Sequence, residues 1–394
     1  MRDVLDELET LWSAGRPFGM ARVVRTWRSA PRAAGATMAV GPDGAAFGSV
    51  SGGCVEGAVY ELAGRVSETG QPVLQRYGVS DDDAAAVGLT CGGVLDVLVE
   101  AVDAESYPEF GAVVESVRTG EPVAVATVIE VDGSGPTAEG EFAGEQPAEL
   151  GRRLVVWPDR RSGSIGSDRL DDAVTDDVRG MLAAGTTDVL RLGRHGERRA
   201  DDLMIFVQSM APKPRMVVFG AIDFAASMAR MGSFLGFRVT VCDARGVFAT
   251  KRRFPDADEV VVEWPHRYLE RELHEGTLDQ RTVVCVLTHD PKFDVPLLQV
   301  ALQTPAAYIG AMGSRRTHDD RMARLREAGV AESDLARISS PIGLDVGART
   351  PEETAVSIAA EIVQTRWGGT GARLAQLSGP IHKDATGLTV RADP

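Results

Sequence analysis

The stretch that decides the fold of this chain is residues 216–225, MVVFGAIDFA. Its apolar run predicts a buried strand, Gly220-Ala221 predicts a turn, and the apolar spacing over 224–235 predicts a helix that ends at Gly236. Strands that alternate with helices are typical of a doubly wound parallel sheet, so a Rossmann-like domain is expected here. The further strands that we expect lie at residues 237–242, 259–262, 283–287 and 307–309.

The chain before this domain has a different pattern. Residues 3–14 have the apolar spacing of an amphipathic helix, and short β-like runs follow, two of them joined by a hairpin turn at 41–44. Two prolines within 210–214 indicate a linker. We therefore expect an α/β chain with an N-terminal α+β domain over 1–210, a C-terminal Rossmann-like domain over 211–370 and a tail over 371–394.

Composition and charge argue against several functional classes. The 394 residues include 42 Lys and Arg against 57 Asp and Glu, a net charge of −15 that opposes binding to nucleic acid or to an anionic membrane. No run approaches the roughly 20 apolar residues of a membrane span, and no signal-peptide pattern follows Met1, so we expect a cytoplasmic protein. The cysteines lack zinc-ligand spacing and are expected to be reduced. They are Cys54, Cys91, Cys242 and Cys285.

The first candidate site is the run 48–56, GSVSGGCVE, which brings Cys54 and Glu56 to the start of a predicted helix. Gly52 and Gly53 allow positive φ and a close approach of a ligand, and the N–H groups of a helix start favour a thiolate. A similar run at 89–93, LTCGG, presents Cys91. Two such thiols indicate a sulfur or ligand site. The alternative is that each thiol fills a small hole in the core.

Part of a dinucleotide-binding fingerprint follows the first strand of the second domain. In that fingerprint the first glycine makes the turn, the second lets the pyrophosphate approach, and an acid about 20 positions on binds a ribose hydroxyl. Gly220, followed by Ala221, and Asp243 fit this pattern. Ile222 stands in place of the second glycine, and Asp223 adds a negative charge. The sequence therefore favours the Rossmann fold over ordinary nicotinamide binding.

Two later loops offer further candidates, because ligands of parallel sheets bind beyond the carboxyl ends of the strands. The first loop carries His289 and Asp290, and the second carries Gly310, Ser314 and Arg315. The alternative is that His289 and Asp290 cap the next helix and that Arg315 is solvated.

Taken together, these segments resemble the XdhC/CoxI family, accessory proteins of molybdenum hydroxylases such as xanthine dehydrogenase and carbon monoxide dehydrogenase. The resemblance spans residues 1 to about 370. It implies a cofactor chaperone more than an enzyme, one that binds molybdenum cofactor, protects it while a sulfido ligand is installed and passes it to the apoenzyme. The motifs that carry the resemblance lie at 29–35, 48–56, 90–93, 248–258, 287–290, 308–316 and 341–345.

The resemblance also implies roles for the candidate residues. Cys54, as the molybdenum ligand, and Glu56 would form the ligand or sulfur-relay pair, with Cys91 as a second thiol near it. The chain departs from the family at Ile222 and Asp223, where Gly-His is usual. The residues expected to line the cofactor are Gly52, Gly53, Gly220, Ala221, Asp243, His289, Asp290, Gly310, Ser314 and Arg315.

The cargo implied by the resemblance is molybdopterin or its cytosine dinucleotide form, bound transiently. The implied partners are an apo molybdenum hydroxylase, a cysteine desulfurase and a second copy of the chain in a homodimer. Two alternatives stay open from the residues: an NAD(P)-dependent oxidoreductase that uses the Rossmann domain and a thiol, and a regulatory protein that has lost ligand binding.

Overall fold

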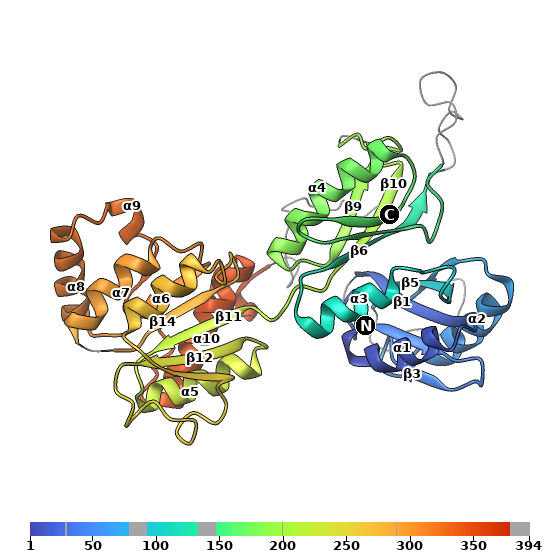
Figure 1. Cartoon of the computed structure of the whole chain (residues 1–394). Coiled ribbons are helices and arrows are strands. Elements are labelled where there is room, and N and C mark those ends of the chain that lie inside the picture. The colour runs from blue at the N-terminus through green and yellow to red at the C-terminus, as the bar shows by residue number, and fades with distance from the viewer. Residues whose placement is uncertain (28–29, 79–92, 133–146, 199, 289, 379–394) are drawn as a thin grey trace. The chain divides into compact units, whose positions relative to one another are not determined.

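The computed structural model describes residues 1–27, 30–78, 93–132, 147–198, 200–288 and 290–378. The chain divides into two compact units, Met1–Pro212 and Lys213–Pro394, and the elements of each are labelled in Figure 1. Two of the predicted site residues, Cys91 and His289, lie outside the described residues, as does most of the predicted tail.

Unit 1 contains two five-stranded antiparallel sheets. The first sheet has the order β3-β2-β1-β5-β4, and the second has the order β8-β7-β6-β10-β9. The first sheet and its helices comprise α1 (Leu5–Ser13), β1 (Phe18–Trp27), β2 (Thr37–Val40), β3 (Ala46–Gly48), α2 (Glu56–Thr69), β4 (Val73–Tyr77) and β5 (Val94–Val102). The second sheet and its helices comprise α3 (Phe110–Thr119), β6 (Ala124–Val131), β7 (Arg153–Val156), β8 (Arg161–Ser164), α4 (Asp168–Ala184), β9 (Asp188–Leu192) and β10 (Leu203–Ser209).

These two halves are an internal duplication, which we call repeat 1 and repeat 2. The order of elements along the chain and the order of strands in the sheet are the same in both. The ladder between the first and last strand is interrupted by a bulge at Val24 in repeat 1 and at Ile129 in repeat 2. In each repeat, a glycine with positive φ, Gly35 or Gly151, donates its N–H to the residue just before that bulge. The duplication was not among the features predicted from the sequence.

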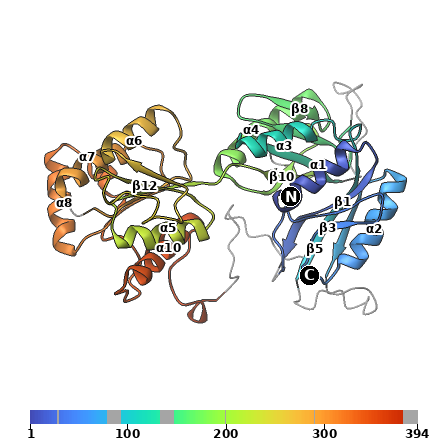
Figure 2. The same ribbon diagram turned by 60° about the horizontal axis from the view of Figure 1, so that its bottom comes forward.

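The repeats pack against each other through equivalent residues. One buried cluster contains Val24 and Leu98 from repeat 1 with their counterparts Ile129 and Phe206 from repeat 2. Helices α1 and α3, which are also equivalent, contact each other, while α2 lies along β1 and β5 (Figure 2). Because equivalent elements meet, two buried clusters combine residues of both repeats, while each repeat also has a buried cluster of its own beneath α2 or α4.

A buried ion network also crosses from repeat 1 to repeat 2. Glu100 of β5 accepts hydrogen bonds from Arg22 of β1, at 2.8 Å, and from Arg153 of β7, at 2.7 Å. Arg22 also donates to Thr127 of β6 at 3.1 Å. Arg22 and Glu100 are almost completely buried, and a buried charge is tolerated only when it is paired and hydrogen-bonded. The network therefore ties the two repeats together in one arrangement.

Unit 2 is a six-stranded parallel sheet of order β13-β12-β11-β14-β15-β16. This is the strand order of the Rossmann fold, so the predicted fold class is confirmed. The strands are β11 (Arg215–Phe219), β12 (Arg238–Asp243), β13 (Glu259–Val262), β14 (Val283–Val286), β15 (Tyr308–Ala311) and β16 (Ile338–Ser339). The helices are α5 (Asp223–Phe234), α6 (Pro265–His274), α7 (Pro291–Ala301), α8 (Arg315–Glu327), α9 (Glu332–Leu335) and α10 (Pro351–Trp367).

Helices cover both faces of the parallel sheet (Figure 1). One buried cluster joins α5 and α10 to one face, and another joins α6, α7 and α8 to the opposite face. Helix α10 begins with a capping box, in which Thr350 and Glu353 satisfy each other's backbone N–H groups. The apolar strands β11, β12, β14 and β15 are buried, as the interior of a doubly wound sheet requires, whereas the edge strand β13 is partly exposed.

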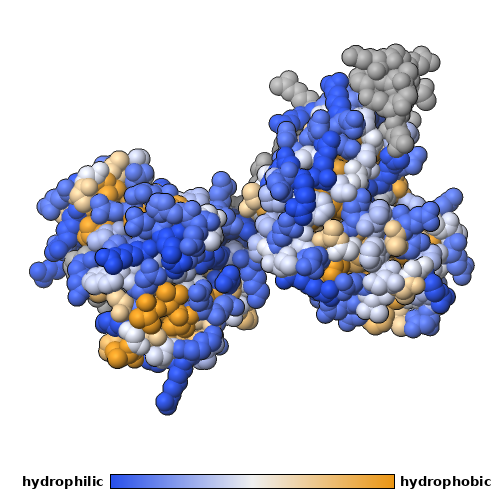
Figure 3. Space-filling view, viewed as in Figure 1, coloured by the Kyte–Doolittle hydropathy of each residue, from blue (hydrophilic) through white to orange (hydrophobic). Residues whose placement is uncertain are grey.

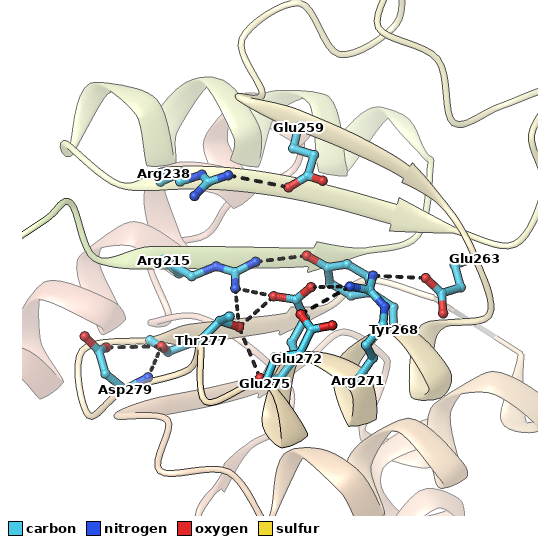
Figure 4. A network of polar contacts seen from close by, with 11 residues as sticks. Arg215, Arg238, Glu259, Glu263, Tyr268, Arg271, Glu272, Glu275, Thr277 and Asp279 are labelled. Carbon is cyan, nitrogen blue, oxygen red and sulfur yellow. Dashed lines mark hydrogen bonds and ion pairs between the residues drawn. The ribbon is translucent and has the colours of Figure 1, made fainter. Parts of the chain in front are cut away.

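A polar network fixes α6 near the amino ends of the strands (Figure 4). Arg215, the first residue of β11, pairs with Glu272 and donates to the hydroxyls of Tyr268 at 2.9 Å and Thr277 at 2.7 Å. Arg238, at the start of β12, makes a longer contact of 3.9 Å with Glu259. Because the ligand-binding edge of such a sheet is the carboxyl edge, this network is structural.

The visible surface is mainly hydrophilic, with apolar side chains gathered on a small part of unit 2 (Figure 3). Across the described ranges, the exposed large apolar side chains other than Tyr60 all belong to unit 2, and they include Phe234 and Trp367. Within those same ranges, no helix combines the length and the apolar character that a membrane crossing requires.

Candidate functional site

The run 48–56 forms an open loop between β3 and α2. Gly52 and Gly53 have φ values of +77° and +118°, which L side chains rarely adopt. A Cβ atom added at either glycine would have no neighbour within 4 Å. The backbone of this loop is therefore exposed to anything that approaches Cys54, whose side chain is half-buried at the edge of the repeat 1 core.

The carboxylate of Glu56 organises this loop. Its Oε1 atom accepts the N–H groups of Val50 at 3.2 Å, Ser51 at 2.9 Å and Gly52 at 3.0 Å, and its Oε2 atom accepts that of Gly53 at 2.8 Å. The hydroxyls of Ser49 and Ser51 also donate to it. Burial acts to raise the pKa of Glu56, but these hydrogen bonds outweigh it and lower the pKa to about 2.

These contacts bear on two expectations from the sequence. The backbone N–H groups of residues 50–53, just before the helix, donate to the carboxylate of Glu56, and those of Cys54 and Val55 donate to the hydroxyl of Ser51, so the N–H groups on this side of Cys54 are already bonded. Glu56 therefore acts on the loop and holds its backbone. As a proton donor or metal ligand it would first have to give up these bonds, so we assign it a positioning role.

Repeat 2 has the same loop without the cysteine. Asp171 stands where Glu56 stands in repeat 1, is buried, and accepts the N–H of Ile165 at 3.0 Å. Helix α4 already begins at Asp168, so the residue that corresponds to Cys54, Arg169, is helical. In repeat 1 the three residues that correspond to this first turn, Gly53, Cys54 and Val55, precede the helix, and Gly52 stands where Ser167 caps α4. The fold does not require this difference, which points to a function for it.

The other described cysteines are core residues. Burial raises the pKa of the Cys285 thiol to about 12 and also raises that of Cys242, so both are unreactive at neutral pH. Across the described parts of the chain, no group of three or more His, Cys, Asp or Glu side chains could hold a metal ion.

A second candidate site is a cavity of about 500 Å³ in unit 2, at the carboxyl ends of β11, β12 and β14. Gly220 makes the turn after β11 with φ +108°, and a Cβ there would lie 3.2 Å from the backbone of Leu287. The residues that line the cavity are Gly220, Ile222, Asp243, Ala244, Arg245, Trp264, Pro265, Leu287, Thr288, Asp290, Lys292 and Phe293.

Asp243 lies where the fingerprint expects it, but its oxygens are occupied. Oδ2 accepts the N–H of Ala221 at 2.7 Å, and the guanidinium of Arg245 donates to Oδ1 at 2.9 Å and to Oδ2 at 2.8 Å. The N–H of Arg245 also donates to Oδ1 at 2.8 Å. Burial acts to raise the pKa of Asp243, and the bonds from Arg245 and the two backbone N–H groups lower it overall.

The structure places Ile222 and Asp223 where the sequence suggests. Ile222 precedes the first residue of α5, and its side chain lines the cavity. Asp223 is 86% exposed and lies 3.3 Å from Arg253. A β-branched side chain and a carboxylate thus flank the place where a pyrophosphate would meet the helix start.

The remaining predicted residues divide between caps and the strand interior. Asp290 caps α7 through the N–H of Lys292, at 3.1 Å, and also lines the cavity. Ser314 caps α8 and lines a smaller cavity of about 340 Å³. Gly310 is buried in β15, where a Cβ would lie 2.4 Å from Ile342, and Arg315 is exposed and lines neither cavity.

Comparison with known proteins adds to this geometry. A family model described as the XdhC Rossmann domain matches residues 216–362, and one described as the XdhC and CoxI family matches residues 11–78 and 141–193. A Bacillus subtilis protein named as a probable xanthine dehydrogenase subunit is 30% identical over 352 residues, 88% of this chain and 92% of that protein. The chain belongs to the XdhC and CoxI family.

Two further relatives extend the comparison. The Escherichia coli protein named molybdenum cofactor insertion chaperone PaoD is 36% identical over 89 residues, 23% of this chain and 28% of that protein. A crystal structure described as a xanthine dehydrogenase from Bacillus halodurans superimposes with a TM-score of 0.63 at 26% identity, covering 92% of this chain and 95% of that one.

The XdhC and CoxI family match also follows the duplication. Its two matched segments fall one in each repeat and end at Gly78 and Gly193, which directly follow the equivalent strands β4 and β9.

Sequence reasoning missed several residues of the unit 2 cavity. Arg245, Trp264 and Phe293 line it, yet none belongs to the fingerprint. The signal for Arg245 is its place two residues after Asp243, at the end of a predicted strand. The aromatic residues lie in loops and at the start of a helix, where their spacing gives no signal.

Proposed function

We propose that this chain is a maturation factor that binds molybdenum cofactor as cargo and passes it to a molybdenum hydroxylase of the xanthine or carbon monoxide dehydrogenase type. The observation that carries this proposal is the loop at Gly52, Gly53 and Cys54. It is open, it presents a thiol, and it stands where repeat 2 has the cap and first turn of α4.

The chemistry of the loop suits this cargo. Molybdenum in the cofactor is a soft, sulfur-bound centre, and a cysteine sulfur is a matching soft ligand. A thiol at an open loop, rather than a closed cage of ligands, suits a cargo that must be released again. In this proposal Cys54 contacts the molybdenum or carries sulfur, Glu56 holds the loop in shape, and Cys91 supplies a second thiol.

The relatives support the same role. One is named a molybdenum cofactor insertion chaperone and another a probable xanthine dehydrogenase subunit. We further propose that the cargo is molybdopterin or its cytosine dinucleotide, that a cysteine desulfurase supplies the sulfido ligand, and that the protein acts in the cytoplasm as a homodimer.

The test is cofactor transfer with purified components. The protein is incubated with released molybdenum cofactor and passed over a gel-filtration column, and the molybdenum and pterin that elute with it are measured. The loaded protein is then added to an apo molybdenum hydroxylase, and the recovered hydroxylase activity is followed.

The matched variants are Cys54→Ser and Arg169→Ser, because Cys54 and Arg169 occupy the same position in the two repeats. We expect Cys54→Ser to lose cofactor retention and transfer, and Arg169→Ser to keep both. Equal retention and transfer by the wild type and Cys54→Ser would contradict the role of this loop.

A further inference from the structure

The cavity of unit 2 differs from an ordinary NAD site in its acidic residue. In an NAD site the acid at the end of the second strand accepts hydrogen bonds from the ribose hydroxyls. Here both oxygens of Asp243 already accept two hydrogen bonds each, from the N–H of Ala221 and from the N–H and guanidinium of Arg245. The carboxylate has little capacity left for a ribose.

Arg245 is the group that the cavity presents in place of that carboxylate. A guanidinium has five N–H donors, and the bonds to Asp243 use Nε and Nη2. The Nη1 edge therefore faces away from the carboxylate, and the side chain is 49% exposed. One face of the guanidinium lies over the ring of Phe248, 5.0 Å from its centroid. The group is thus held in place while one edge stays open.

The rest of the lining suits a flat aromatic ring. Trp264 and Phe293 stand with their ring centroids 5.1 Å apart, and Pro265 and Leu287 add apolar surface. The other charged groups that face this space are Lys292 and Asp290, whose charged atoms lie 3.0 Å apart. An aromatic base could stack on this wall while an anion meets Arg245.

We propose that this cavity binds a nucleotide whose ribose carries a 2′-phosphate, and that Arg245 selects that phosphate. The inference concerns unit 2 alone and does not depend on the cofactor-carrier function proposed for the Cys54 loop. An Arg beside the strand-end acid is the general means by which Rossmann domains accommodate a 2′-phosphate, and the occupied carboxylate removes the competing ribose contact.

Binding is tested by calorimetry on the full-length protein with two matched pairs of probes. NADP⁺ and NAD⁺ differ only in the 2′-phosphate, as do adenosine 2′,5′-bisphosphate and 5′-AMP. The second pair lacks a pyrophosphate and so avoids Ile222 and Asp223. In at least the second pair, we expect the member with the 2′-phosphate to bind about tenfold more tightly, or better, than the member without it. This is the effect of one charge-assisted contact.

Three variants locate the effect. Arg245→Gln should bring the two members of a pair to equal affinity. Asp290→Asn should tighten binding of the 2′-phosphate, because it removes a nearby negative charge while an asparagine still caps α7. Arg238→Gln removes a similarly exposed positive charge at the opposite end of β12 and should leave the affinities of all four probes unchanged. Asp290→Asn leaves the Arg245 pair intact, so it tests the proposal even if Arg245→Gln fails to fold.

The outcomes separate clearly. The proposal is supported if the wild type prefers the member with the 2′-phosphate and Arg245→Gln abolishes that preference. The preference can appear in both pairs or only in the second. Equal affinity within both pairs, tighter binding of the members that lack the 2′-phosphate, or no binding of any of the four probes would overturn it. None of these results bears on cofactor retention by the Cys54 loop, which the transfer assay measures separately.

Discussion

Glu56 and Asp171 occupy the same position in the two repeats of unit 1, and each carboxylate accepts the backbone N–H of the equivalent loop residue. For Glu56 that residue is Val50, at 3.2 Å, and for Asp171 it is Ile165, at 3.0 Å. The chain thus contains an internal control for its own candidate site, because the carboxylate is common to both loops while the cysteine belongs to one.

This relationship predicts different outcomes for two matched variants. Glu56→Gln and Asp171→Asn should each lower the free energy of unfolding by about 1–3 kcal/mol, since an amide cannot accept all the bonds that a carboxylate accepts. Only Glu56→Gln should also reduce cofactor retention. Urea denaturation and the retention assay measure the two effects. Loss of retention in Asp171→Asn at full stability would show that the assignment to repeat 1 is wrong.

The contribution of Glu56 to stability should depend on pH. Its pKa is lowered from 4.5 to about 2 in the folded protein, so its stabilisation is fully present above about pH 4.5 and is lost as the pH falls towards 2. The difference in melting temperature between the wild type and Glu56→Gln should therefore be constant from pH 7 to 5 and shrink below that. Thermal melts of both proteins at matched pH values test this, and a difference that grows on acidification would count against it.

Cys54 should be the most readily alkylated of the described cysteines. Cys242 and Cys285 are buried, and burial raises the pKa of both thiols, whereas Cys54 is half-buried beside two exposed glycines. Iodoacetamide labelling of the folded protein followed by peptide mass analysis measures the order of reaction. The experiment is carried out in a Cys91→Ser variant, so that only Cys54, Cys242 and Cys285 can be labelled. Labelling of Cys285 before Cys54 would be incompatible with the assignment.

Replacement of the two residues that depart from the family pattern should strengthen nucleotide binding. Ile222 lines the cavity and Asp223 stands exposed at the start of α5, so Ile222→Gly with Asp223→His opens the approach and removes a repelling charge. We expect NADP⁺ to gain more affinity than adenosine 2′,5′-bisphosphate, because only NADP⁺ carries a pyrophosphate. Calorimetry that shows equal affinity before and after the change would place the nucleotide elsewhere.

The network at the amino ends of the unit 2 strands should matter for stability. Arg215→Gln removes from the nearly buried carboxylate of Glu272 a largely buried ion-pair partner, leaving it Arg271 and Thr277, which should cost about 3 kcal/mol. Arg238→Gln breaks an exposed contact of 3.9 Å with Glu259 and should cost less than about 1 kcal/mol. Chemical denaturation compares the two variants, and similar losses from both would refute the structural role given to Arg215.

The Rossmann domain could be predicted because its inner strands β11, β12, β14 and β15 are buried and appear in the sequence as short apolar runs between helices. The predicted strand at 259–262 and the predicted helix end near Gly236 both match the structure. The internal duplication of unit 1 is harder to recognise in the sequence than the Rossmann domain. Gly48-Ser49-Val50 returns as Gly163-Ser164-Ile165, but the loops between the strands differ in length and hide the repeat.

The site was predictable in its residue types and less so in their roles. Cys54 and the two glycines before it stand out in the sequence, whereas the part played by Glu56 depends on N–H groups whose directions only the folded loop defines. In the same way, Asp243 matches a known pattern, but its pairing with Arg245 reverses what the cavity offers to a ligand. The sequence pattern therefore identifies the candidate residues, and the hydrogen bonds around each residue in the folded protein determine its role.

The backbone of the loop around Cys54 is arranged like an anion-binding site, and the carboxylate of Glu56 occupies that site. Four successive backbone N–H groups converge as they would on a phosphate, yet they hold the chain's own carboxylate. Inorganic phosphate, sulfate or the phosphate of a pterin would therefore have to displace the carboxylate of Glu56 in order to bind these N–H groups. With these N–H groups occupied by Glu56, the half-buried thiol of Cys54 and the exposed backbone of Gly52 and Gly53 are the groups left for a ligand, so we expect this loop to favour a soft metal centre over a simple anion.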